Sequence, residues 1–188
     1  MASKRDHIIE TACELFELQG YNATGLNEIV RKSGSPKGSL YHYFPGGKDE
    51  LTAEAITHTG EAIRRRIELS LSAVDAPADA VRQFIRDLSV HVEASGYRAG
   101  GPITTIALET AATNDVLREE CAAVYGVWQA AFAQKLAAGG ITPDRAARLA
   151  TLIVAVLEGA ILLSRTERSR QPLLDAAEEL GVLIACAL

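Results

Sequence analysis

Glu54 and His58 are the first residues to consider for chemistry, because they lie four positions apart on one face of a predicted helix and could bind a metal ion. The rest of such a site is missing: a di-iron helical bundle uses Glu-x-x-His pairs, and none occurs in the sequence. The segment from Gly46 to Lys48 could be half of a nucleotide-binding loop. However, His42 stands where that loop needs its first glycine, and Asp49 where Ser or Thr must hold magnesium. Neither pattern supports catalysis.

The cysteines do not indicate a reactive site either. Cys13, Cys121 and Cys186 are widely spaced and odd in number, which suits neither a disulfide framework nor a metal site. Buried structural thiols are the expectation. The sequence also lacks a nucleophile elbow and the pattern of a Ser-His-Asp triad. We therefore expect a protein that is not an enzyme and has no catalytic residue, metal or cofactor.

The chemistry that the sequence favours is binding to phosphates. The chain has four cations from position 31 to position 48, namely Arg31, Lys32, Lys37 and Lys48, and no acidic residue there, although its net charge is −5. Lys48 follows two glycines at the start of a predicted helix, so its ammonium and free backbone N–H groups could face one phosphate together. The run predicts a phosphate-binding patch, although such a run can also be a solvated surface.

Two short predicted helices must position these cations. In the first helix, Leu26, Ile29 and Val30 share one face, and the Thr24 side chain can cap exposed N–H groups. Gly34 ends this helix. The two helices are joined by a Gly-Ser-Pro break, and this arrangement is typical of a helix-turn-helix, although an ordinary helical hairpin can carry the same punctuation.

The second predicted helix carries the candidate DNA-reading residues. Ser35 can cap it, and Pro36 fits its first turn, where the missing N–H costs nothing. Leu40, Tyr43 and Phe44 form its buried face.

The opposite face of this helix follows from a rotation of about 100° per residue. Gly38 and His42 point most directly away from Leu40, with Ser39 and Tyr41 beside them. Glycine allows close approach of the backbone, and the other three side chains offer polar groups to base edges in a major groove. These four residues are the predicted DNA readers.

The segment from Met1 to about Leu51 resembles the N-terminal domain of TetR-family transcriptional repressors. The family's first helix, aromatic turn and second helix are matched by residues 8–30, IIETACELFELQGYNATGLNEIV. Its turn, recognition helix and the start of its fourth helix are matched by residues 34–51, GSPKGSLYHYFPGGKDEL. The second segment is most similar to a branch of the family that responds to antibiotics and flavonoids.

The resemblance implies DNA contacts residue by residue. Base or backbone contacts are implied for Lys37, Gly38, Ser39, Tyr41 and His42, and phosphate contacts for Thr24, Tyr43 and Lys48. The expected partner is double-stranded DNA with a palindromic operator.

Almost the whole chain predicts helix, because apolar positions recur at three and four residues and the breaks fall at Gly and Pro. The expected fold is all-α with about nine helices. A three-helix DNA-binding domain with a helix-turn-helix would occupy residues 1–47, and a helical ligand-binding and dimerisation domain residues 48–188. The predicted helices after the first three span 48–73, 77–95, 103–112, 115–138, 143–165 and 172–188.

No targeting or membrane segment is predicted. The charged N-terminus lacks the apolar core of a signal peptide. The longest apolar stretch, Leu149 to Ser164, is interrupted by Glu158 and falls short of the ~20 residues that a membrane span needs. We expect a cytoplasmic protein without a membrane partner.

The last two predicted helices are apolar over more than one stripe, so they need cover on several sides. A second subunit can supply it: a symmetric dimer with a four-helix bundle would present two recognition helices about one DNA turn apart. The resemblance implies the same homodimer. Alternatively, these helices are central to the core of a monomer.

Polar groups on otherwise apolar helices, together with several aromatic residues, could line a pocket for a small-molecule effector. The candidate ligand-binding residues are Phe84, His91, Thr105, Glu109, Tyr125, Trp128, Phe132 and Glu158. The alternative is that the aromatic residues are core, that each Thr bonds its own helix backbone, and that Glu158 pairs with Arg165 or across a dimer.

The sequence thus predicts a transcriptional repressor that an apolar or aromatic small molecule releases from its operator. The alternative is an architectural DNA-binding protein without a ligand. Activation instead of repression also stays open.

Overall fold

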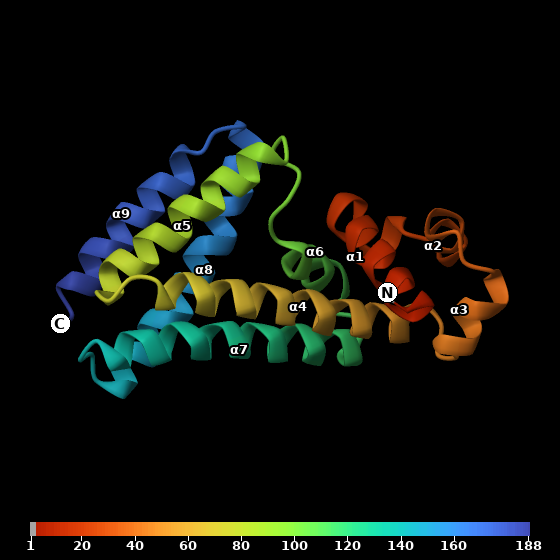
Figure 1. The fold of residues 1–188 in the computed structure, drawn as a ribbon, viewed down its shortest axis with the longest axis horizontal. Helices are drawn as coiled ribbons and strands as arrows, with labels where there is room; N and C mark the ends of the chain where they lie inside the picture. Colours follow the sequence, from red (N-terminus) through yellow and green to blue (C-terminus); the bar gives the residue numbers. More distant parts are fainter. Residues whose placement is uncertain (1–2) are drawn as a thin grey trace. The chain divides into compact units, whose positions relative to one another are not determined.

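The computed structural model describes residues 3–188, and these form nine α-helices and no strand (Figure 1). The helices are α1 (Lys4–Ala23), α2 (Leu26–Ser33), α3 (Lys37–Tyr43), α4 (Lys48–Ser72), α5 (Pro77–Ala94), α6 (Pro102–Thr110), α7 (Asp115–Ala138), α8 (Pro143–Glu167) and α9 (Gln171–Ala185). The predicted all-α class is confirmed, and the predicted helix ends lie within a few residues of those observed.

The helices form two compact units. The first contains residues 1–61 and 101–124, and the second residues 62–100 and 125–188. Helices α4 and α7 therefore each contribute residues to both units. The first unit contains the whole helix-turn-helix and also α6.

Helix α1 is capped at its start and broken near its end. The Ser3 side chain accepts a hydrogen bond from the Asp6 N–H, and the Asp6 carboxylate accepts one from the Ser3 N–H. This reciprocal pair satisfies two exposed N–H groups. Gly20 then leaves helical geometry with φ 84° and ψ 172°, so the long helix stops where the sequence predicts. The Tyr21 ring follows and contacts the Phe16 ring, with centroids 6.2 Å apart.

The break between α2 and α3 follows the predicted chemistry, but the caps differ. Gly34 ends α2 in the left-handed conformation, with φ 62°. The predicted caps Thr24 and Ser35 are wrong: Gly25 is the N-cap of α2 and Pro36 that of α3, and neither provides a side-chain hydrogen bond. Thr24 is not available because its hydroxyl donates to the Gly20 carbonyl, at 2.7 Å.

The core of the first unit is built where α1, α2 and α3 meet and where α6 packs on α1. Its fully buried side chains are aliphatic or phenyl groups: Ile8, Leu15, Phe16, Ile29, Leu40, Phe44, Leu51, Ile56, Ile103 and Leu117. Burial of such side chains is the main favourable term for a small helical unit.

In the second unit, α5 packs along α9, and α8 packs on both (Figure 1). Apolar side chains such as Ile85, Ile153 and Ile184 are fully buried there. Polar contacts add to this packing: Arg86 Nη2 lies 2.6 Å from a Glu178 carboxylate oxygen, and Lys135 Nζ donates to the Val74 carbonyl, also at 2.6 Å.

One expectation from the sequence, that all three thiols are buried, needs correction here. Cys186 is exposed, because it follows α9 and is not on the buried stripe that contains Leu180 and Ile184. Cys121 is buried as expected, and Cys13 is half-buried. Helix α8 contains the apolar stretch that the sequence showed, and by length and composition it could cross a membrane. Core helices of soluble proteins pass the same test.

Candidate functional site

Helix α3 presents the face that the sequence predicts. Leu40 has no exposed surface and holds the helix to the core. On the other side, Gly38, Tyr41 and His42 are exposed and Ser39 is half-buried. The exposed fraction of Tyr41, at 47%, is large for an aromatic residue. A helix with one buried face and a mixed polar and aromatic outer face can enter a DNA groove.

The remaining predicted DNA contacts on α3 differ in exposure. Lys37 is exposed at the first position of the helix. Tyr43 is half-buried, and its ring packs edge-on between its neighbours in sequence, with centroids 5.2 Å from His42 and 6.4 Å from Phe44. The phenol therefore belongs partly to the core of the unit.

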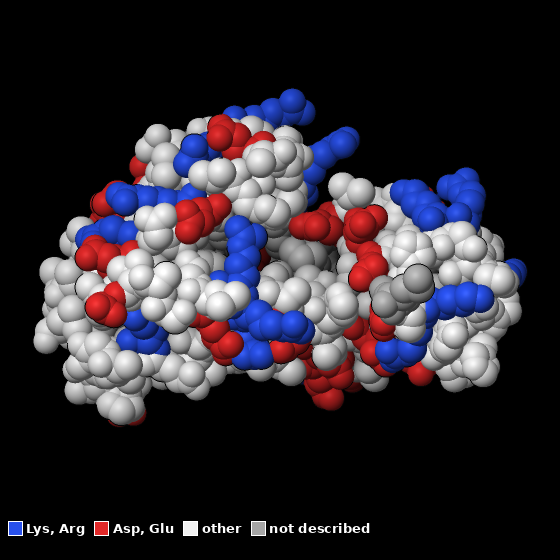
Figure 2. Space-filling model, in the orientation of Figure 1, with Lys and Arg blue, Asp and Glu red and all other residues white. Residues whose placement is uncertain are grey.

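Cationic side chains gather over α2 (Figure 2). Arg31 and Lys32 are both exposed, and each lies near the carboxylate of Glu28 one turn earlier, at 3.8 Å and 3.7 Å. Exposed ion pairs of this kind contribute little to stability. The two cations can therefore exchange this carboxylate for a phosphate at small cost.

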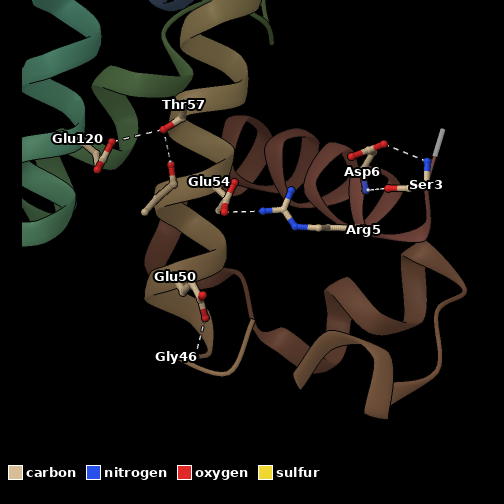
Figure 3. Close-up of polar contacts among 9 residues, drawn as sticks. Ser3, Arg5, Asp6, Gly46, Glu50, Glu54, Thr57 and Glu120 are labelled. Atoms are coloured by element: carbon tan, nitrogen blue, oxygen red, sulfur yellow. Dashed lines mark hydrogen bonds and ion pairs between the residues drawn. The ribbon is translucent and has the colours of Figure 1, made fainter. Parts of the chain in front are cut away.

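The start of α4 carries Lys48, the cation closest to the turn after α3. Two backbone N–H groups in the turn before α4 are bound within the protein. The Gly46 N–H donates to the Glu50 carboxylate at 2.7 Å (Figure 3), and the Gly47 N–H donates to the Phe44 carbonyl at 2.9 Å. Both of these N–H groups precede α4, so the predicted joint contact of the Lys48 ammonium and the first free N–H groups of the helix with one phosphate stays a prediction.

The Lys48 ammonium lies over an aromatic ring. Its Nζ is 3.9 Å from the centroid of the Tyr21 ring, which is within the range of a cation–π contact. Partial burial lowers the pKa of Lys48, and the nearby carboxylates of Asp49 and Glu109 oppose that shift. The ammonium is therefore held near one position by its ring contact.

Thr24 has no exposed surface. Its side chain closes the turn after α1 by donating to the Gly20 carbonyl, and its N–H donates to the Tyr21 carbonyl. A phosphate contact by Thr24, as the resemblance implied, would need a rearrangement of this turn and stays a prediction.

The next turns of α4 are tied to two other helices (Figure 3). Arg5 of α1 pairs with Glu54, and the guanidinium of Arg5 also lies 5.5 Å from the centroid of the Phe44 ring. The Thr57 hydroxyl donates to the Glu120 carboxylate of α7 at 3.3 Å. Glu54, which the spacing to His58 first marked as a possible metal ligand, thus has a cation as its partner.

The predicted ligand-binding residues divide between the two units. In the second unit, the rings of Phe84 and Phe132 pack edge-on at 5.6 Å, and those of Tyr125 and Trp128 at 5.5 Å. His91 is exposed near the end of α5, and Glu158 is half-buried on α8.

A cavity of about 540 Å³, largely open to solvent, lies between α4 and α5 within the second unit. Of the predicted ligand-binding residues, only Phe84 lines it. The other lining residues are Ala62, Arg65, Arg66, Leu69, Ser70, Ala73, Gln83 and Asp87. Its volume is within the range of small-molecule sites. Sequence reasoning missed its α4 wall, because Arg65 and Arg66 look like ordinary surface charges on a long helix.

Thr105 and Glu109 belong to the first unit. The Thr105 hydroxyl donates to the Gly101 carbonyl at 3.1 Å, which is the helix-backbone bond that the alternative interpretation expected. The Glu109 carboxylate accepts from the Asn22 N–H at 2.6 Å, just after the break in α1. Both groups have protein partners, and a ligand contact for either stays a prediction.

Two protein families match this sequence. The family described as "Bacterial regulatory proteins, tetR family" matches residues 8–55, and "Transcriptional regulator LmrA/YxaF-like, C-terminal domain" matches residues 77–179. The chain belongs to the TetR family of transcriptional regulators. Its TetR assignment thus covers the helix-turn-helix and most of the remaining helices, and the DNA-binding class of the protein is no longer only a prediction.

Relatives along the whole length support the same assignment. The chain is 43% identical to the "Uncharacterized HTH-type transcriptional regulator YxaF" of Bacillus subtilis, over 96% of this chain and 94% of the relative. It is 40% identical to the "HTH-type transcriptional regulator LmrA" of the same organism, over 90% of each chain. A solved TetR regulator from Chloroflexus aurantiacus is 30% identical and superposes with a TM-score of 0.80, covering 97% of this chain and 94% of that one. All three of these relatives are described as transcriptional regulators.

Proposed function

We propose that this TetR-family protein is a repressor that binds a palindromic operator as a homodimer and that a small molecule releases it. The observation that carries the DNA-binding part is the face of α3, where Gly38, Tyr41 and His42 are exposed over a fully buried Leu40. In this proposal, residues 1–47 read DNA, residues 48–188 bind the effector and form the dimer, and the protein acts in the cytoplasm.

Each residue has its own role in this proposal. Ser39, Tyr41 and His42 read base edges in the major groove, and Gly38 allows the backbone to approach the DNA closely. Lys37 and Lys48 bind phosphates, with Tyr43 beside them, and Thr24 contacts DNA only if its turn opens. Phosphate contacts position the protein on the duplex, and base contacts specify the sequence.

The dimer is supported by exposed apolar side chains on α8 and α9. Leu162 and Leu163 are 60% and 51% exposed, and Val182 is 53% exposed. A large contiguous apolar patch on a protein surface marks an interaction site, and in this proposal these side chains belong to such a patch. A symmetric pair of these helices would form a four-helix bundle and place two copies of α3 on one DNA face.

The effector is an apolar or aromatic compound, of the kind represented by antibiotics and flavonoids. The cavity between α4 and α5 supports this part, because its wall combines Phe84 and Leu69 with two arginines and a few polar groups. Effector binding favours a conformer in which α4 has shifted and the two recognition helices no longer match the operator. Only a difference in effector affinity between the two states is required.

A selection of bound duplexes from a random DNA pool, at physiological salt, tests the DNA-binding part. We expect enrichment of a palindrome. Salt-sensitive binding without enrichment would instead favour an architectural protein.

The enriched duplex then serves as the probe for the effector. We expect at least one compound from a panel of flavonoids and antibiotics to lower operator affinity. If saturating concentrations of compounds that bind the protein leave operator affinity unchanged, release by an effector is refuted.

A further inference from the structure

One carboxylate joins three helices of the first unit. Asp49, in the first turn of α4, accepts a hydrogen bond from the Tyr21 hydroxyl at the end of α1. Its second oxygen accepts one from Asn114 Nδ2 at 2.8 Å. Asn114 also accepts from the Leu117 N–H through its own side-chain oxygen, at 3.1 Å, and so caps α7.

The Tyr21 ring held by Asp49 is the ring under the Lys48 ammonium. The hydrogen bond to Asp49 fixes the hydroxyl end of the ring, and the ring face lies 3.9 Å from Lys48 Nζ. A lysine side chain has several rotatable bonds, so contact with a fixed aromatic ring restricts the positions of its ammonium. Asn114 is therefore connected to Lys48 through two intermediate side chains.

A second attachment supports the same turn. The Glu109 carboxylate at the end of α6 accepts from the Asn22 N–H at 2.6 Å. It also fills the space beside Gly20, where any added side chain would collide with it. Residues from the segment 101–124 thus hold both the backbone beside Tyr21 and the carboxylate that orients its ring.

We propose that Asn114 is a positioning residue for DNA binding: through Asp49 and Tyr21 it holds the Lys48 ammonium where the operator phosphate binds, and so sets operator affinity. This inference rests on the proposed function, specifically on the phosphate contact of Lys48. It assigns a part in DNA binding to a residue far along the chain from the helix-turn-helix.

The test exchanges the two polar partners. Asn114→Asp keeps an oxygen to cap α7 but places a second carboxylate against Asp49. The double variant Asp49→Asn with Asn114→Asp restores one amide and one carboxylate with their positions exchanged, and it keeps the net charge. Thr113→Asp is the matched control, because this exposed neighbour adds the same charge and its hydroxyl bonds the Thr110 carbonyl instead of Asp49.

Affinity is measured on the duplex enriched from the random pool, at several salt concentrations, after thermal unfolding has shown that each variant is folded. We expect Asn114→Asp to weaken binding by about fivefold or more beyond the effect of Thr113→Asp. We also expect it to reduce the salt slope toward that of Lys48→Ala. The double variant recovers both quantities.

A cycle with Lys48→Ala identifies the route of the effect. If Asn114 acts through Lys48, then Asn114→Asp produces no further loss beyond the charge control when Lys48 is already alanine. The inference is overturned if Asn114→Asp and Thr113→Asp weaken binding equally, if the double variant fails to recover, or if the losses add fully. If Lys48→Ala itself changes neither affinity nor salt slope, the phosphate contact in the proposed function fails instead.

Discussion

The outer face of α3 and the first turn of α4 both contribute predicted DNA contacts, but the fold treats them differently. On α3, Tyr41 and His42 are exposed side chains on a seven-residue helix. At the start of α4, Lys48 lies over the Tyr21 ring, which is in turn bound by Asp49.

The difference suggests a division of work. Base edges vary from site to site, and exposed side chains can adjust to them on binding. A phosphate has the same form at every site, so a charge already held in place loses less conformational freedom on binding it. In this view, α3 determines which sequence is bound, and the first turn of α4 determines how tightly any sequence is bound.

The largest expected effect comes from truncating the buried side chain that holds α3 to the core. Leu40→Ala should lower the free energy of unfolding by about 2 to 5 kcal/mol, because Leu40 is fully buried and its loss leaves a cavity. Binding to all DNA should fall with it. Urea unfolding measures the change, and Leu18→Ala on α1 is the control, because Leu18 is 57% exposed. Equal destabilisation by the two substitutions would contradict the packing of α3.

His42→Ala should act on specificity. We expect it to reduce discrimination at particular base pairs by about 1 to 3 kcal/mol, with an unchanged salt slope. Binding to single-base variants of the enriched duplex measures this. His7→Ala on α1, which removes another exposed histidine, is the control. A uniform loss of affinity for all single-base variants of the duplex would indicate that His42 contacts a phosphate instead of a base.

Lys48→Ala should have the opposite pattern. Affinity should fall by a similar factor for all sequences, and the slope of log affinity against log salt should flatten by about one unit, as for one lost phosphate contact. Lys48→Arg keeps the charge and should keep the slope. Loss of base preference without a change of slope would remove the proposed division between α3 and α4.

The smallest expected effect concerns the Tyr21 ring under the Lys48 ammonium. Burial and the hydrogen bond to Asp49 raise the pKa of Tyr21 to about 12, from an ordinary value of 10.0. Between these values the unfolded chain loses the phenol proton while the folded chain keeps it, so the stability of the folded state falls as pH rises through this window. Tyr21→Phe has no such proton, and its free energy of unfolding should fall less steeply between pH ~10 and ~12. Parallel curves for the two proteins in urea unfolding would rule out this coupling.

Most of the fold could be predicted because its helix boundaries have local causes. Gly34 adopts the left-handed conformation that ends α2, and prolines occupy the first turns of α5, α6 and α8. The exposed face of α3 followed from rotation about the helix axis alone. The caps of α2 and α3 did not follow, because whether Thr24 caps a helix depends on a competing bond to Gly20.

The surroundings of Lys48 could not be predicted from the sequence. Tyr21 and Asp49 are 28 residues apart, and Asp49 and Asn114 are 65 apart, so no local pattern connects them. Glu109 is a second example. Its position on an apolar helix predicted a pocket residue, but its carboxylate accepts a hydrogen bond from the Asn22 N–H. The sequence identified residues whose side chains can take part in binding. The partners that these side chains contact depend on tertiary packing.

The compact unit that contains the helix-turn-helix is assembled from two separate stretches of chain, residues 1–61 and 101–124. This arrangement limits how far the helix-turn-helix can be exchanged between related regulators. A hybrid regulator joined after residue 47 would take Tyr21 from one parent and its partners Asp49 and Asn114 from the other. Transfer of DNA specificity should therefore succeed best when the donor also supplies α6 and the first turns of α4 and α7. It should also succeed when both parents have the same residues at those positions.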